Sequence, residues 1–114
     1  MSIDNDEIVN TTSKYIVKST GKLGETDQIL VDAEELIEGT DGSTVSLIEC
    51  YYVIEGTGTL TISADSETKP LSFTNSGKYG LMPGQLKFGN DKQFKLTTDA
   101  NVKSYLLVTE FRRN

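Results

Sequence analysis

The sequence predicts an all-β domain, a sandwich or barrel built from short strands. Residues rich in β-branched and aromatic side chains gather in short runs, and Gly, Asn, Ser, Asp and Pro separate these runs at close intervals. No long stretch has the periodicity of an amphipathic helix. A length of 114 residues fits one domain with a hydrophobic core of its own.

The strongest strand is expected over residues 44–55, TVSLIECYYVIE, which is rich in β-branched and aromatic residues. Asp32 with Glu35 is a weak helix-start signal, but Gly39 follows at once, so we expect only a short connection there. Residues 1–10 are expected to form a flexible acidic arm or, alternatively, an edge strand, and the domain is expected over 11–114. Further strands are expected over 15–17, 59–63, 71–74, 79–82, 86–88, 93–97 and 104–111, with turns at 19–21, 56–58, 75–77, 83–84 and 89–91.

Composition excludes several classes of function. With 17 acidic and 11 basic residues, the net charge of −6 and the scattered lysines argue against nucleic acid as a partner. No apolar stretch is long enough to span a bilayer, and acids occupy the N-terminus where a signal peptide has bases, so a cytoplasmic location is expected. The sequence has one cysteine and no histidine, which excludes an internal disulfide and any nucleophile paired with histidine.

Two motifs resemble those of the cupin family of jelly-roll barrels. The segment 49–56 has a glutamate, six residues and a glycine, and 52–58 (YVIEGTG) is similar to the family's aromatic-Val-Leu-Glu-Gly-x-Gly stretch. The segment 77–83 has the glycine, five residues and proline of the second cupin motif, with Gly84 close behind. The resemblance runs from 43 to 108 and implies a cupin-type jelly-roll β-barrel.

The metal ligands of that family are missing from the sequence. The two histidine positions of the first motif fall on Ser43 and Val45, or on Gly42 and Thr44, and the histidine of the second falls on Phe88. Only the glutamate, Glu49, remains, and one carboxylate cannot hold a first-row metal. We therefore expect no metal and no cofactor. The alternative is a residual cation site of Glu49 with oxygen ligands from Asp41, Ser43, Thr44 or Gln85.

Strand alternation would direct Glu49 into the barrel together with Tyr51 and Val53. There Glu49 is either an acid or base with a raised pKa or a family relic that hydrogen-bonds a neighbour. The candidate catalytic residues are thus Glu49, Tyr51 and Tyr79.

The candidate ligand-binding residues lie on a later segment. Phe88 would form either part of a filled core or a wall of an apolar cavity. Gln85 and Lys87 would be polar contacts at its mouth, although Lys87 also suits a solvated surface.

The opposite face of the 44–55 strand would carry Cys50, Tyr52 and Ile54. Cys50 is expected to be a small buried filler and not a reactive thiol. The three apolar side chains on this face predict packing against another strand or a second copy, so a homodimer is expected.

Two functions remain open. One is a metal-free cupin-like protein that binds a small organic molecule, or serves as a dimeric binding or structural module. The other is a metal-independent enzyme, an isomerase, epimerase or lyase acting on a sugar or small acid by Glu/Tyr acid–base chemistry.

Overall fold

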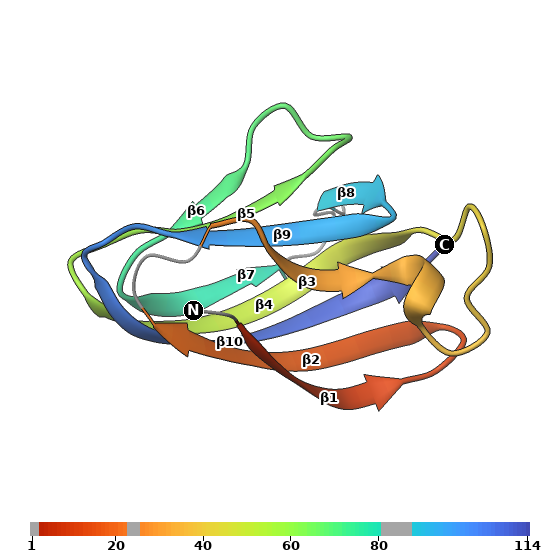
Figure 1. Ribbon diagram of the computed structural model, residues 1–114, viewed down its shortest axis with the longest axis horizontal. Coiled ribbons are helices and arrows are strands. Elements are labelled where there is room, and N and C mark those ends of the chain that lie inside the picture. The colour runs from red at the N-terminus through yellow and green to blue at the C-terminus, as the bar shows by residue number, and fades with distance from the viewer. Residues whose placement is uncertain (1–2, 23–25, 81–87) are drawn as a thin grey trace.

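The protein consists of two antiparallel β-sheets packed face to face, as the computed structural model of residues 3–22, 26–80 and 88–114 shows (Figure 1). The larger sheet has the order β1 (Asp4–Asn10), β2 (Lys14–Lys22), β10 (Val102–Arg113), β4 (Val45–Gly56) and β7 (Ser76–Gly80). A further strand, β8 (Phe88–Asp91), pairs with the beginning of β4. The smaller sheet has the order β3 (Gln28–Asp32), β9 (Gln93–Thr98), β5 (Leu60–Ala64) and β6 (Leu71–Phe73). The expected all-β jelly-roll domain is confirmed.

The centre of the larger sheet is the pair of long strands β4 and β10, which run antiparallel from Val102 opposite Gly56 to Arg113 opposite Val45. Gly56 ends β4 with a φ of +104°, and a Cβ there would collide with the carbonyl oxygen of Asn101. This confirms the need for glycine at the predicted turn after β4.

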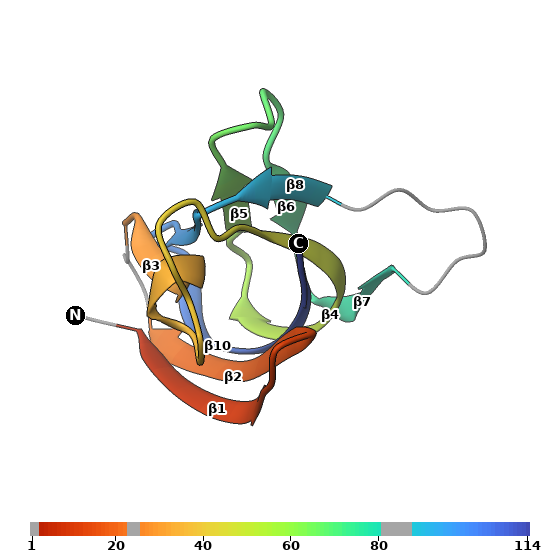
Figure 2. The ribbon, with the colours of Figure 1, turned by 90° about the vertical axis from the view of Figure 1, so that its right-hand side faces the viewer.

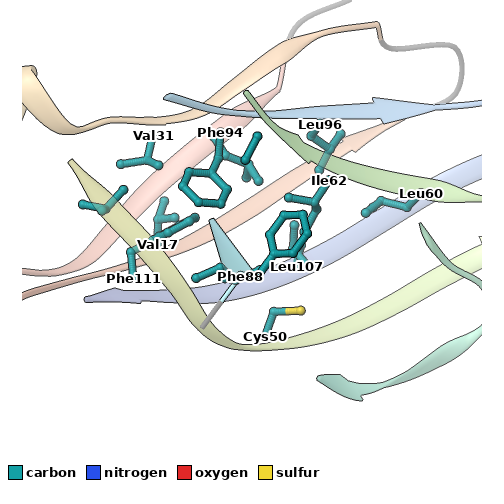
Figure 3. Packing of buried hydrophobic residues seen from close by; sticks show 14 of the residues in the cluster. Val17, Val31, Cys50, Leu60, Ile62, Phe88, Phe94, Leu96, Leu107 and Phe111 are labelled. Atoms are coloured by element: carbon teal, nitrogen blue, oxygen red, sulfur yellow. The ribbon is translucent and has the colours of Figure 1, made fainter. Parts of the chain in front are cut away.

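The core lies between the two sheets and is filled by side chains from both (Figure 3). Phe94 of β9 lies at its centre, 5.0 Å from Phe111 of β10 and 6.2 Å from Phe88 of β8 between ring centroids. Viewed along the strands, the larger sheet curves around this core (Figure 2). The largest fully buried side chains are Phe94, Phe111, Leu30, Leu47, Leu60, Ile62, Leu96, Leu107, Val17, Val45 and Val102.

The N-terminal segment differs from the flexible arm expected. Residues Asp4–Asn10 form edge strand β1, which pairs with β2 from Asp4 opposite Thr20 to Asn10 opposite Tyr15. The Ser19 hydroxyl, fully buried, donates a 2.6 Å hydrogen bond to Asn5 Oδ1. This bond satisfies a buried polar group. Strand β2 continues through the turn expected at 19–21, because these residues pair with Tyr105 to Leu107 of β10.

Other local expectations had mixed outcomes. The turn expected at 89–91 lies within β8, and β3 was not anticipated. Asp32 caps a 3₁₀ turn over Ala33–Glu35 by accepting a hydrogen bond from the Glu34 amide, which confirms the short connection. Residues 81–87, including Pro83 and Gly84 of the second motif, lie outside the described residues. Among the described residues, no helix has the length and apolarity needed to cross a membrane.

Candidate functional site

The outer face of β4 carries the residues that sequence alternation would place inside the barrel. Tyr51 is 44% exposed and Val53 is 53% exposed, whereas Cys50 is fully buried. The expected orientation of Glu49, Tyr51 and Val53 is therefore wrong. The cause is a bulge: Glu110 of β10 faces Glu49, but the next residue, Phe111, faces Leu47, so Ile48 is extra and reverses the alternation.

The opposite residues of β4 lie inside the barrel and do not form a surface for a second copy. Burial raises the pKa of the Cys50 thiol to about 12, so it is a packed filler without thiolate reactivity. The Tyr52 ring stacks on Phe73 of β6 with centroids 4.3 Å apart. Ile54 is also buried in the core. Of the two alternatives expected for this face, the structure shows packing against another strand, and Cys50 is the buried filler that was expected.

Glu49 faces Glu110 directly across the outer side of the larger sheet. The Glu49 Oε2 atom is buried and has no hydrogen-bond partner among the described residues. Burial raises the pKa of Glu49, the negative charge of Glu110 raises it further, and the charge of Lys78 opposes them. This position therefore favours the protonated form of Glu49.

The three candidate catalytic residues do not converge. Glu49 and Tyr51 lie on the outer face, whereas Tyr79 pairs with Cys50 and packs 6.1 Å from Phe73 between ring centroids. An acid–base set that joins Glu49 to Tyr79 across one cavity therefore has no support in this geometry.

Of the three candidate ligand-binding residues, the structure describes only Phe88. Phe88 is buried against Phe94, which fits the filled-core alternative and not a cavity wall. Gln85 and Lys87 lie outside the described residues and stay predictions.

The described residues contain no group of three or more His, Cys, Asp or Glu side chains that could hold a metal ion. Of the oxygen ligands named for a residual cation site, Thr44 and Ser43 make hydrogen bonds elsewhere, and Gln85 lies outside the described residues. Thr44 donates a 2.6 Å hydrogen bond to Asn90 Oδ1, and Ser43 Oγ accepts one of 2.9 Å from the Thr40 amide. The bonds of Thr44 and Ser43 therefore give no support to a cation site at Glu49 among the described residues.

The surface feature that sequence reasoning missed is an apolar strip on the outer face of β4 and β10. Val53 lies opposite Leu106, and Tyr51 lies opposite Val108; these four residues form what we call the outer strip. Leu106 is 37% exposed, and a shallow depression of about 350 Å³ lies beside Val53 and Leu106. The signal in the sequence was the continuous run Leu106-Leu107-Val108, because it places apolar residues on both faces of one strand.

Comparison with known proteins identifies the fold. No protein-family model and no curated protein matches the sequence. A cupin domain from Bordetella pertussis Tohama I is similar at a TM-score of 0.47 and 9% identity, covering 99% of this chain and 94% of that one. The Schizosaccharomyces pombe Cnp3 cupin domain is similar at a TM-score of 0.52 and 6% identity; the alignment covers 98% of this chain but only 61% of the Cnp3 domain. The resemblance seen in the motifs is therefore confirmed at the level of structure: this chain has the cupin fold.

Proposed function

We propose that this protein is a non-catalytic cupin-fold module that pairs with a second copy of itself through the outer strip. The observation that carries the proposal is the exposure of Tyr51, Val53 and Leu106 side by side on the two central strands of the larger sheet. Scattered exposed apolar residues are ordinary on a protein surface, but a contiguous exposed apolar group is typical of an interface.

Charge favours a second copy as the occupant. Lys78 lies opposite Tyr51 on β7, and Lys18 lies opposite Val108 on β2, so lysines flank the row that Tyr51 and Val108 occupy. The adjacent row carries Glu49 and Glu110. A two-fold axis between these rows brings the acidic row of each copy against the lysine-flanked row of the other, which is the self-complementarity that a symmetric dimer needs.

The same geometry weighs against chemistry inside the barrel. Glu49, the acid expected there, lies on the outer face opposite Glu110. The core beneath it is filled by Phe88, Phe94 and Phe111. These placements favour a binding or structural module over the metal-independent enzyme.

The test is the solution mass by sedimentation equilibrium for the wild type and for Val53→Lys. We expect the wild type to approach twice the chain mass of 12.5 kDa and the variant to sediment as a single chain. Lysine at position 53 would bury an unpaired charge in the interface, whereas in the monomer this position is exposed.

Ile37→Lys is the matched control, because Ile37 is 51% exposed but lies away from the outer strip, and it should leave the mass unchanged. Circular dichroism establishes that both variants are folded. A wild type that remains at 12.5 kDa up to millimolar concentration overturns the proposal. Equal dissociation by both lysine variants also overturns it.

A further inference from the structure

A groove lies where the edge strands of the two sheets, β1 and β3, come together on one side of the molecule (Figure 2). Two hydrogen bonds cross between the sheets at this place. The Asn5 side-chain amide donates to the Ile29 carbonyl at 2.9 Å, and the Ile3 amide donates to Gln28 Oε1 at 3.3 Å. The walls of the groove are therefore fixed to each other.

The groove has a volume of about 200 Å³, and both polar and apolar side chains line it. Leu30, Val31 and Leu36 contribute the apolar surface. At roughly 30 Å³ for each water-sized group, this volume holds a ligand of about six heavy atoms. The space suits a short alkyl chain.

The groove is also lined by a tyrosine that is nearly buried. Tyr15 lines the groove and is only 6% exposed, and its hydroxyl has no hydrogen-bond partner among the described residues. Burial and the nearby charge of Glu7 raise the pKa of Tyr15 to about 12, so the phenol stays protonated at neutral pH. A buried phenol normally bonds to a neighbour, so this one is available to a ligand.

Three carboxylates line the same groove: Glu7 of β1, Asp32 at the end of β3, and Glu35. Asp32 is held in place, since Oδ1 accepts from the Glu34 amide at 3.1 Å and Oδ2 accepts from the Gln93 side-chain amide at 2.8 Å. Glu35 is exposed at the rim and makes no hydrogen bond or ion pair with the described residues.

One lysine in this part of the structure, Lys92, is engaged with Asp32 and Glu34. Lys92 Nζ lies 3.5 Å from Glu34 and 4.0 Å from Asp32, so it offsets only part of the negative charge. Lys92 does not line the groove. Glu7 and Glu35 are left without a cation of their own among the described residues.

We propose that this groove binds an alkylammonium group. The ammonium nitrogen has three N–H donors, and Glu7, Glu35 and the Tyr15 hydroxyl oxygen supply acceptors around it. The alkyl chain then lies on Leu30 and Val31, where burial of its methylenes adds to the affinity. The same group occurs in a free aliphatic amine and in a lysine side chain, and the test distinguishes these sources.

The test is a titration of the ¹⁵N-labelled protein, followed by amide chemical shifts, with butylammonium and with butanol as the uncharged probe. We expect saturable shifts in β1, β3 and the 3₁₀ turn with butylammonium only. Glu35→Gln should weaken binding about tenfold, because a charge-assisted hydrogen bond is lost. Tyr15→Phe should weaken it about fivefold, and it should fold normally because the hydroxyl has no partner among the described residues.

Glu38→Gln is the matched control, since Glu38 is an exposed acid on the same segment but outside the groove lining, and binding should be unchanged. A parallel titration with Nα-acetyl-lysine methylamide tests the lysine side chain as the source of the ammonium group. The amine that binds more tightly shows whether the groove prefers a free aliphatic amine or a lysine side chain. Absence of saturable shifts with both amines overturns the proposal. So does equal binding of butanol and butylammonium, or an unchanged affinity in Glu35→Gln.

Discussion

The two faces of β4 and β10 are built from the same kinds of residues but have opposite surroundings. On the inner face, Cys50 and Leu107 are fully buried in the core. On the outer face, Tyr51 and Leu106, their neighbours in sequence, are 44% and 37% exposed. Apolar character alone therefore does not reveal which face of these strands determines stability and which one is free to bind a partner.

The adjacent leucines of β10 give the sharpest way to separate the faces. Leu107→Ala should lower the free energy of unfolding by about 2 to 5 kcal/mol, because it leaves a cavity in a close-packed core. Leu106→Ala should lower it by less than about 1 kcal/mol in the monomer, because much of that side chain already contacts water. Urea unfolding at low protein concentration measures both.

Protein concentration is the control for this comparison. If the outer strip pairs two copies, the urea midpoint of the wild type should rise with protein concentration. The urea midpoint of Leu106→Ala should rise less. Equal losses for the two leucines in the monomer would contradict the assignment of the faces.

The fold class and most strand positions were readable from the sequence, but the direction of the β4 side chains was not. Counting by twos from Leu47 places Glu49 and Tyr51 inside, and a single extra residue, Ile48, reverses that result. Nothing in the run LIECYY marks a bulge, since apolar residues occupy both phases of the alternation. The bulge follows from pairing with β10, about sixty residues later in the chain.

The groove was beyond sequence reasoning for a related reason. Its walls come from β1, expected as a flexible arm, and from β3, which was not anticipated. They are joined by side-chain bonds such as that from Asn5 to the Ile29 carbonyl, 24 residues away in sequence. Local patterns predict strands, but they do not predict which two edges lie side by side.

Each face also has one buried oxygen without a hydrogen-bond partner among the described residues, and the inner one is Thr109 Oγ1. Thr109 is fully buried opposite Cys50. Thr109→Val removes this hydroxyl with little change of shape and should raise the free energy of unfolding by about 1 kcal/mol.

The matched control for Thr109→Val is Thr20→Val on the outer face of β2, which should change stability by less than about 0.5 kcal/mol. The gain for Thr109→Val should be the same at pH 5 and pH 8, since no charge is involved. A loss of stability in Thr109→Val would show that the hydroxyl has a bonding role in the core.

The outer oxygen, Glu49 Oε2, should give the smallest effect, and one that depends on pH. The pKa of Glu49 in the folded protein is raised above its ordinary value of 4.5, so between those two values the folded state binds more protons than the unfolded state. The free energy of unfolding therefore falls as pH rises through this window. Glu49→Gln removes the charge and donates to Glu110, so at neutral pH it should stabilise the protein by about 0.5 kcal/mol.

That gain should disappear below the ordinary pKa, where Glu49 is protonated in both the folded and unfolded states. Urea midpoints of wild type and Glu49→Gln, compared from pH 4 to pH 8, measure the difference. Glu55→Gln, an exposed acid further along β4, is the control and should follow the wild type across this range. If the midpoints of wild type and Glu49→Gln differ by the same amount at every pH, the carboxylate of Glu49 destabilises the fold through its missing hydrogen bond. The charge facing Glu110 would then not be the cause.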